Sequence, residues 1–286
     1  MINKEKISLG ATQETLLITL WARAVEASQP EPILFDPKAA DILAQIDYDF
    51  EQFSKAKSSQ MIVCLRSQTI DQWVKAFLNN NPAGTVVEIG AGLNTRFERL
   101  DNGTLNWFDL DLPDAIAVRR LYLEESDRRH FLSKSALEPD WIDAVKATTS
   151  NPPLFIAEGV LVYFSEEQVK MLLTMLADNF PGGFLAFDAT SWLAVRYRRR
   201  FDAIKHTCAK FQWGIENIKE IEAWDLRYKI EASLYLSDFL PYLRRFSWGD
   251  RLLFALMPQL LQMYGIHLVR LGGSPSANVL SITDQS

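Results

Sequence analysis

Between residues 85 and 189, short apolar runs alternate with amphipathic segments, and this alternation constrains the fold more than any other feature. The apolar runs are TVVEIG (85–90), NWFDLD (106–111), HFLS (130–133), PLFIAEG (153–159) and GGFLAFDA (182–189). Between the last two lies SEEQVKMLLTMLADNFPGG, which begins with a capping serine, Ser165, and stops at Pro-Gly-Gly. Strands and helices in this order predict right-handed βαβ units and a mostly parallel sheet. Runs such as FLAF are apolar on both faces, which indicates helices on both sides of the sheet.

The flanking segments have a different pattern. The first 80 residues are mostly helical: TQETLLITLWARAVEAS is broken by QPEPILFDP, and SQMIVCLRSQTIDQWVKAFLNNN stops at NPAG (81–84). After residue 190 the pattern indicates helices with an insertion, and then the runs YKIEASLYL and IHLVRL. We expect these two runs to form an antiparallel pair that closes the sheet.

Composition narrows the class of protein. A net charge of −6 over 286 residues argues against a nucleic-acid partner, which needs a concentrated basic face. The cysteines, Cys64 and Cys208, are far apart, and the histidines, His130, His206 and His267, form no cluster, so we expect neither a disulfide framework nor a metal site. The N-terminus lacks a secretory signal, and no apolar run approaches the roughly 18 residues that span a bilayer. We therefore expect a cytoplasmic protein without a membrane partner.

The end of the first apolar run has the pattern of a nucleotide-binding loop. Glu88 is followed by Gly90 and Gly92, and ligands of open α/β sheets bind at the carboxyl ends of the strands. The dinucleotide fingerprint G-x-G-x-x-G requires a third glycine at position 95, where this chain has Thr95. That threonine argues against an NAD-dependent oxidoreductase.

A ligand without phosphates fits the acids of this region better. S-adenosylmethionine carries an amino group that favours a nearby carboxylate, whereas Glu88 would repel a pyrophosphate. The strand after the loop should then end in an acid that accepts hydrogen bonds from the ribose hydroxyls. Asp111 ends that strand, with Asp109 two residues earlier. These residues predict a site for S-adenosylmethionine rather than for a dinucleotide.

Three motifs together resemble one known family. They are VVEIGAGLNTRFERL, WFDLDLPDAIAVRR and LFIAEGVLVYFSEEQVKMLL, and the similarity runs from about residue 12 to 190. The chain resembles the leucine carboxyl methyltransferase family, and within it the bacterial O-methyltransferases of polyketide pathways. The resemblance implies an α/β, Rossmann-like class I methyltransferase fold with a mostly parallel seven-stranded sheet, helices on both faces, an N-terminal helical cap and a late helical insertion.

No linker divides the chain, so we predict one domain over residues 1–286. Its expected parts are a helical N-terminal cap (1–82), a cofactor-binding core (83–190) and a segment of lid or insertion helices with the closing strands (191–286).

The resemblance also implies roles for individual residues. Arg66 occupies the place of an arginine that grips the cofactor's carboxylate, and Gly90 that of a glycine against the methionine part. Asp111 would take the ribose, and Glu158 would lie near the cofactor's amino group and the reaction centre. A glutamate directly after LFIA is costly to bury without a partner, which independently indicates a site residue.

One position departs from the family. The family usually has an Asp-Leu pair after the third strand that contacts adenine, and this chain has Ser135 and Ala136 there. A serine supplies a weaker hydrogen bond, or the backbone takes over the contact. Thr95 and Arg96, after the glycines, are expected to cap and anchor the following helix.

The acceptor is less constrained than the cofactor. No Gly-x-Ser-x-Gly elbow and no obvious catalytic histidine is present. A carboxylate acceptor is ionised at neutral pH and needs no base, whereas a phenol with a pKa of about 10 would profit from one. Candidate residues on the acceptor side are Trp21, Arg23, Tyr163, Trp192, Arg196 and Tyr197.

The sequence thus predicts an S-adenosylmethionine-dependent O-methyltransferase without a metal. Its acceptor is a carboxylate or a phenolic hydroxyl of a small-molecule metabolite, polyketide-type or another organic acid. Two alternatives stay open: methylation of a protein's C-terminal carboxylate, and a protein that binds S-adenosylmethionine without catalysis, as the departure at Ser135 and Ala136 allows. The oligomeric state is not predicted.

Overall fold

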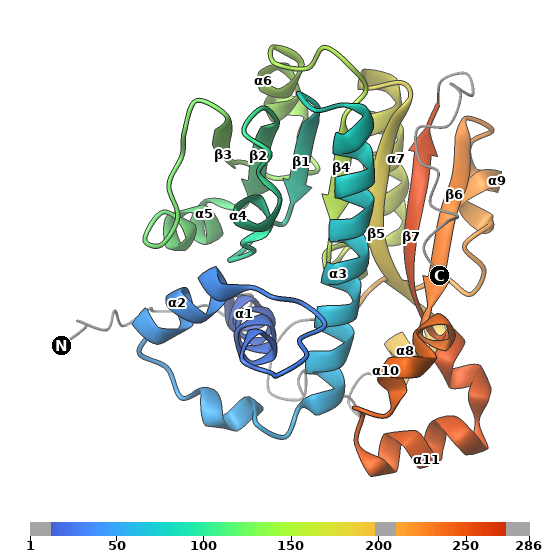
Figure 1. Ribbon diagram of the computed structural model, residues 1–286. Helices are drawn as coiled ribbons and strands as arrows, with labels where there is room; N and C mark the ends of the chain where they lie inside the picture. The colour runs from blue at the N-terminus through green and yellow to red at the C-terminus, as the bar shows by residue number, and fades with distance from the viewer. Residues whose placement is uncertain (1–12, 198–209, 273–286) are drawn as a thin grey trace.

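A seven-stranded sheet organises the chain (Figure 1). The computed structural model describes residues 13–197 and 210–272. The strands are β1 (Thr85–Ile89), β2 (Asn106–Asp111), β3 (Arg129–Ser133), β4 (Leu154–Ala157), β5 (Gly183–Thr190), β6 (Tyr228–Tyr235) and β7 (Tyr264–Leu271). Their order is β3-β2-β1-β4-β5-β7-β6. The first five strands are parallel, and β7 runs antiparallel between β5 and β6. The predicted parallel sheet and its antiparallel closing pair are confirmed.

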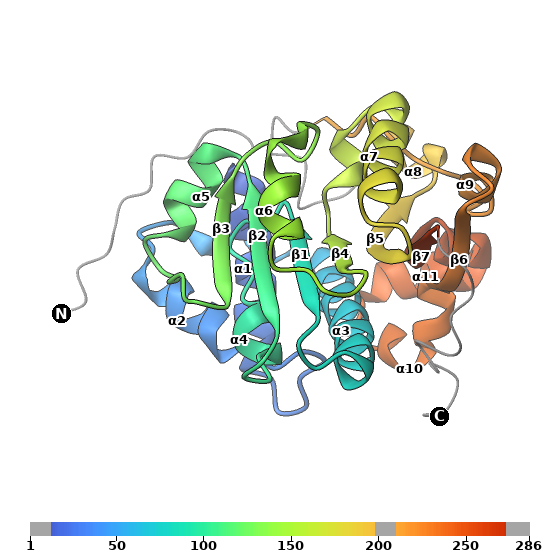
Figure 2. The same ribbon diagram turned by 90° about the horizontal axis from the view of Figure 1, so that it is seen from above.

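Helices cover both faces of the sheet because neighbouring residues of each strand point to opposite sides. Val87 packs with α6 (Ile142–Lys146) and α7 (Glu166–Asn179), whereas Val86 packs against α3 (Lys57–Asn80). Figure 2 shows α6 and α7 on one side of the sheet and α3 on the other. The second half of α3 therefore covers one face of the sheet.

The helix α7 forms as its sequence predicts. Ser165 accepts a hydrogen bond from Gln168 N (3.3 Å), and the Gln168 side chain accepts one from Ser165 N (2.8 Å), which completes a capping box. The buried face has helical spacing and consists of Val169, Leu172, Leu173, Leu176 and Ala177. Truncating one of these leucines to alanine should cost about 2–5 kcal/mol of stability.

Helices that precede β1 and the segment that follows β6 lie near the carboxyl ends of the strands. In Figure 1 the helices α1 (Gln13–Ala27) and α2 (Pro37–Gln45) lie below the carboxyl ends of β1 and β2. The first half of α3 packs with residues from 236 to 261, which follow β6. The remaining helices are α4 (Arg96–Leu100), α5 (Pro113–Arg119), α8 (Trp192–Tyr197), α9 (Glu220–Trp224), α10 (Leu240–Leu243) and α11 (Trp248–Leu256).

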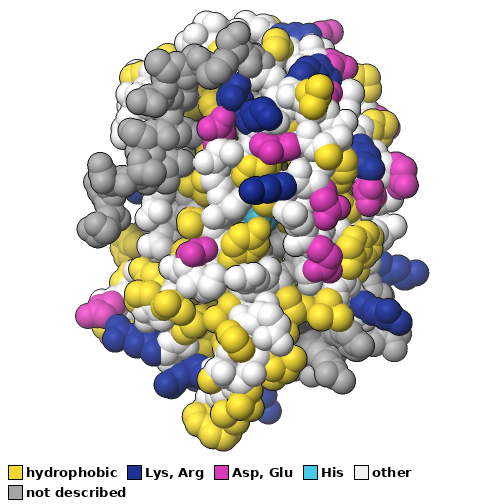
Figure 3. Space-filling model, turned by 90° about the vertical axis from the view of Figure 1, so that its right-hand side faces the viewer, with side chains coloured by type: hydrophobic (Ala, Val, Ile, Leu, Met, Phe, Trp, Pro, Cys, Tyr) yellow, Lys and Arg dark blue, Asp and Glu magenta, His cyan; other side chains and the backbone are white. Residues whose placement is uncertain are grey.

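Part of the late insertion presents apolar side chains to solvent. Trp248, Leu252 and Leu256 on α11 are exposed, and Figure 3 shows apolar side chains gathered at the lower end of this face. None of the helices in the described part of the chain is long and apolar enough to cross a membrane.

Candidate functional site

The loop between β1 and α4 depends on its two glycines. Gly90 and Gly92 have φ values of +66° and +46°, a region that side chains disfavour. A Cβ on Gly90 would lie 2.3 Å from Cγ2 of Val160, and one on Gly92 would lie 2.6 Å from Cδ2 of Leu16. The loop is therefore packed from two sides, by the turn after β4 and by α1.

Asp111 lies at the end of β2, beside this loop. Its Oδ2 accepts a hydrogen bond from Gly92 N (2.7 Å), and its Oδ1 accepts one from Leu112 N (2.8 Å). Burial raises the pKa of the Asp111 carboxyl, and these two amides oppose the shift. Each oxygen keeps a lone pair, so the carboxylate can accept two hydroxyl donors in addition.

Asp109, two residues earlier, has a structural role instead. It is buried and pairs with Arg119 (2.8 Å) and Arg129 (2.9 Å). Arg119 in turn donates to the carbonyl oxygen of Gly92 (2.7 Å). Asp109 thereby holds the arginine that fixes the glycine loop from beneath.

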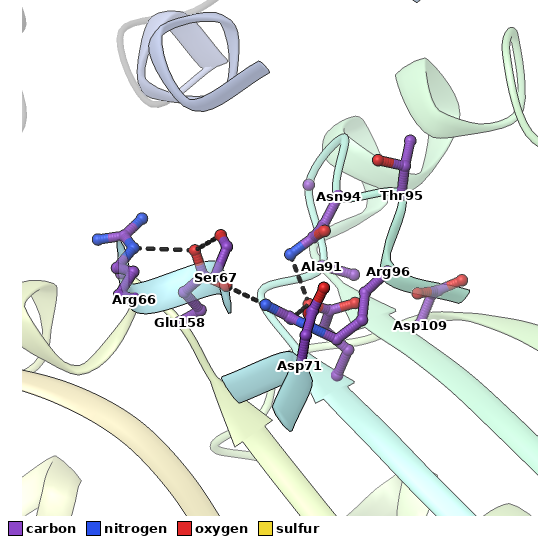
Figure 4. A network of polar contacts seen from close by, with 12 residues as sticks. Arg66, Ser67, Asp71, Ala91, Asn94, Thr95, Arg96, Asp109 and Glu158 are labelled. Carbon is purple, nitrogen blue, oxygen red and sulfur yellow. Dashed lines mark hydrogen bonds and ion pairs between the residues drawn. The ribbon is translucent and has the colours of Figure 1, made fainter. Parts of the chain in front are cut away.

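Arg96 connects three acids under the loop (Figure 4). It is fully buried, donates from Nε to Asp71 (2.6 Å), and forms ion pairs with Glu88 and Glu158. Burial alone would raise the pKa of Glu158, but Arg96 and Arg66 outweigh it and hold that pKa well below its usual range. Glu158 is therefore ionised at neutral pH.

The negative charge of Glu88 is less well compensated than that of Glu158. Burial raises its pKa to about 7, with Arg96 opposing the shift and Asp109 and Glu158 adding to it. Asn94 donates to its Oε1 (2.8 Å), but Glu88 Oε2 and Asn94 Oδ1 are buried acceptors that have no hydrogen-bond partner among the described residues. Such acceptors beside a glycine loop fit a ligand that brings donors, such as an ammonium group.

Arg66 projects from α3 toward the ends of β4 and β5. Its Nε donates to Oε1 of Glu158 (2.9 Å), and its Nη1 pairs with Oδ2 of Asp188 (3.2 Å). Ser67 donates to the same Glu158 oxygen (2.7 Å). Arg66 is buried, so it is not a solvated helix arginine.

Comparison with known proteins decides the family. The family model described as leucine carboxyl methyltransferase matches residues 16–177. The chain belongs to the leucine carboxyl methyltransferase family. It is 34% identical over 239 residues to the tetracenomycin polyketide synthesis O-methyltransferase TcmP of Streptomyces glaucescens, covering 82% of this chain and 88% of that protein. It is 27% identical over 269 residues to the S-adenosyl-L-methionine-dependent methyltransferase dpfgK of Gibberella zeae, covering 86% and 90%.

The fold agrees with this assignment. A crystal structure of an S-adenosylmethionine-dependent methyltransferase from Anabaena variabilis superposes with a TM-score of 0.50 at 11% identity, covering 79% of this chain and 96% of that chain. The expected class I fold and the expected activity, O-methyl transfer dependent on S-adenosylmethionine, are confirmed by the family.

One prediction for this member of the family is wrong. Thr95 stands at the N-cap of α4, but its side chain does not cap the helix. Its Oγ1 lies 2.7 and 2.6 Å from the two carboxylate oxygens of Asp36. Asp36 also accepts hydrogen bonds from Arg23 (3.0 Å) and Arg99 (2.7 Å). Thr95 therefore joins the glycine loop to the N-terminal helical segment, to which Asp36 belongs. Arg96 likewise does more than anchor α4, because its guanidinium is committed to the acids below the loop.

The structure separates the acceptor-side candidates. Trp21 packs against Phe53 in the interior of the cap, and Arg23 is buried with Asp36, so neither lines an open site. Trp192 and Arg196 lie exposed on α8, whose last residue is Tyr197; the Tyr197 side chain and His206 lie outside the described residues.

Tyr163 is better placed than the other candidates. It ends the short turn η3 (Leu161–Tyr163) after β4, and its ring lies 5.6 Å from that of Phe211. Burial raises the pKa of its hydroxyl, while Arg66 opposes this shift, so Tyr163 stays neutral. It can donate a hydrogen bond.

Ser135 and Ala136 follow β3, which pairs with β2 through Ser133 and Asp111. Ser135 Oγ accepts from Leu137 N (3.3 Å), and Ala136 packs partly against the core. The loop is thus next to Asp111, where the adenine contact is expected.

Sequence reasoning missed Asp188, Tyr264, Asp36 and Arg119. Asp188 had a usable signal, because it is an acid inside the apolar run FLAFDA, as Glu158 follows LFIA. The other three had none, because their partners are distant in the sequence.

Proposed function

We propose that this methyltransferase transfers a methyl group from S-adenosylmethionine to a carboxylate oxygen of a small organic acid, of the polyketide type or a related metabolite. The proposal of a small acceptor is supported by the polyketide relative, which covers most of both chains. The choice of a carboxylate rests on the charged groups of the site.

The cofactor contacts are proposed from the geometry above. Asp111 accepts the ribose hydroxyls, and the unpartnered oxygens of Glu88 and Asn94 accept the ammonium group. Arg66 takes the carboxylate, and the positive φ values of Gly90 and Gly92 give the loop the course that places its backbone beside the ligand. Bound S-adenosylmethionine supplies an already activated methyl group. The protein's task is then to align the acceptor and exclude water, which can supply much of the rate.

Ser135 and Ala136 are proposed to border the adenine. The Ser135 hydroxyl is already engaged with Leu137 N, so the contact falls to the backbone of this loop or to a weak second hydrogen bond of the serine. Glu158 is proposed to border the reaction centre as a fixed negative charge. Its two oxygens are held by Arg66, Arg96 and Ser67.

One observation carries the choice of acceptor: the acids near Arg66 are committed to donors. Glu158 is held ionised by two arginines, and Asp188 accepts from Gly159 N (2.5 Å), Arg66 and Tyr264. Desolvation lowers the pKa of the buried His267 to about 3, so its neutral ring is a poor proton acceptor near neutrality. The acids next to Arg66 are therefore not free to deprotonate a phenol, and Glu88, whose pKa is raised to about 7, is assigned to the ammonium group. A carboxylate acceptor needs no base.

The test uses two matched aromatic acceptors with the purified enzyme and S-adenosylmethionine. One carries a carboxylate and a methylated phenol; the other carries a free phenol and a methyl ester. We expect methylation of the first only, with a product that mild alkali hydrolyses, because esters are labile and aryl ethers are not. At saturating S-adenosylmethionine, whose ammonium group keeps Glu88 ionised, the expected rate is flat between pH 6 and 8, since the acceptor carboxylate is ionised throughout.

Other outcomes overturn the proposal in distinct ways. An alkali-stable product from the free phenol, with a rate that rises with pH, would establish a phenolic acceptor. Methylation of a peptide with a free C-terminus, but not of its amidated form, would establish a protein acceptor. Binding of the cofactor without transfer to any of these acceptors would favour a non-catalytic binding protein.

A further inference from the structure

We propose that Tyr264 and Asp188 are positioning residues that orient Arg66 toward the carboxylate of the cofactor. This inference rests on the proposed function, because it assumes that Arg66 takes that carboxylate. Both residues lie outside the segment that matches the family, residues 16–177. The antiparallel strand β7 would thus contribute to cofactor binding from the far side of β5.

The sheet register brings the two side chains together. β5 and β7 are antiparallel, with Thr190 opposite Tyr264 and Asp188 opposite Ile266. Residues two apart on a strand share a face, so Tyr264 stands diagonally across from Asp188. The Tyr264 hydroxyl donates to Oδ2 of Asp188 at 2.8 Å. Burial raises the pKa of this hydroxyl well above its usual value, so it remains a donor at neutral pH.

Asp188 divides its two oxygens between the backbone and the arginine. Oδ1 accepts from Gly159 N at 2.5 Å, and Oδ2 accepts from Tyr264 and from Nη1 of Arg66 at 3.2 Å. With only Glu158 as a partner, the guanidinium could turn about its single Nε contact. The second contact, from Asp188, fixes the direction of the two terminal nitrogens.

Gly159 allows this placement of the guanidinium. Its φ is +69°, and a Cβ at this position would lie 2.8 Å from Nη2 of Arg66. The guanidinium therefore lies directly on the Gly159 backbone, between Glu158 and Asp188. In Figure 4 the terminal nitrogens of Arg66 point away from the Glu158 carboxylate. An arginine has five N–H donors, so the donors of Arg66 that are not engaged by Glu158, Asp188 or Tyr264 are left for a ligand carboxylate.

The test compares two ligands that differ in the amino-acid tail. S-adenosylhomocysteine carries the carboxylate, whereas 5′-methylthioadenosine has the same nucleoside and lacks the tail. Isothermal titration of Tyr264→Phe and Asp188→Asn should show about tenfold weaker binding of S-adenosylhomocysteine than wild type, a loss of about 1.4 kcal/mol. Binding of 5′-methylthioadenosine should be unchanged in both variants.

Tyr228→Phe is the matched control. Tyr228 is a buried tyrosine of β6 whose hydroxyl lies 3.4 Å from Thr174 Oγ1, away from the site. This variant should bind both ligands as wild type does. If Tyr264→Phe weakens both ligands equally, or neither, the positioning role is overturned.

A further variant separates this inference from the proposed function. Arg66→Met should lose the preference for S-adenosylhomocysteine, and adding Tyr264→Phe to it should cost nothing more, since the two residues act through one contact. If Arg66→Met changes neither affinity, the proposed contact with the cofactor carboxylate is wrong, and the inference falls with it. If Arg66→Met loses the preference and Tyr264→Phe keeps it, only the positioning role is overturned.

Discussion

The backbone amide of Gly92 donates a 2.7 Å hydrogen bond to Oδ2 of Asp111, which ties the glycine loop to the end of the next strand. The same loop is held from below by Arg119, through the Gly92 carbonyl oxygen. The carboxylate that is proposed to take the ribose is thus oriented by the loop that is proposed to take the methionine part. A change at Asp111 should be felt by every ligand that carries the ribose.

Asp111→Asn should weaken binding of both S-adenosylhomocysteine and 5′-methylthioadenosine. An amide has one acceptor oxygen in place of two and no charge, so hydrogen bonds worth about 1.5–3 kcal/mol are lost, or about 10- to 100-fold in affinity. Isothermal titration measures both. Asp127→Asn, at an exposed position in the turn before β3, is the control and should bind as wild type does. Unchanged affinity in Asp111→Asn would show that Asp111 does not hold the ribose.

Gly90→Ala should destabilise the protein and weaken cofactor binding. Gly103 also has a positive φ, +82°, but a Cβ there would meet nothing within 4 Å. Gly103→Ala should therefore cost only the backbone strain, about 1–2 kcal/mol in free energy of unfolding. At Gly90 the contact with Val160 adds about 1–3 kcal/mol and shifts the loop. Urea unfolding and titration with S-adenosylhomocysteine measure the two effects; equal losses in both variants would contradict the packing at Gly90.

Glu158→Gln should be strongly destabilising. The substitution removes one charged partner from each of two buried arginines, leaving Arg66 with Asp188 and Arg96 with Asp71 and Glu88. Breaking such buried ion pairs costs about 3–5 kcal/mol in free energy of unfolding. Glu166→Gln is the control, because Glu166 pairs with Lys170 on the exposed side of α7 and should cost about 0.3–0.5 kcal/mol. Thermal unfolding distinguishes them. A loss in Glu158→Gln no larger than that of the control would mean that this charge network is not formed.

Glu88 should make stability depend on pH. In the folded protein it keeps its proton up to about pH 7, whereas a glutamic acid in the unfolded chain loses it near pH 4.5. Between these values the folded state binds more protons, so this group's contribution to the free energy of unfolding falls as the pH rises and levels off above about 7. Urea unfolding of wild type and Glu88→Gln at pH 5, 6, 7 and 8 isolates the effect. Between pH 5 and 7 the free energy of unfolding should fall with pH more steeply, or rise less, in wild type than in Glu88→Gln. Parallel curves for the two proteins would refute the prediction.

The strands and their order of connection could be predicted because their signals are local. The runs that form β1, β4 and β5 are buried on both faces, and the Ser165 capping box marks the start of α7 within a few residues. The glycine loop and Asp111 could be predicted for a related reason, because strand ends of a parallel sheet meet at one edge.

The charge network could not be predicted in the same way. Thr95 and Asp36 are 59 positions apart. From the sequence alone, a threonine after the glycines therefore looks like the N-cap of the next helix, and only the fold shows that Asp36 lies beside it. Arg96 finds Asp71 on a helix and Glu158 after a strand, and only the tertiary fold shows that they meet. Tyr264 reaches Asp188 through the register of two antiparallel strands, which a pattern of apolar residues does not fix to one position.

The central claim is that the loop of Gly90 and Gly92, with Asp111, holds S-adenosylmethionine rather than a dinucleotide. Isothermal titration of the purified wild-type protein with S-adenosylhomocysteine, and in parallel with NADH, tests it most directly. We predict saturable one-to-one binding of S-adenosylhomocysteine at micromolar concentrations and no binding of NADH. Absence of binding up to millimolar S-adenosylhomocysteine, or saturable binding of NADH, would contradict the account.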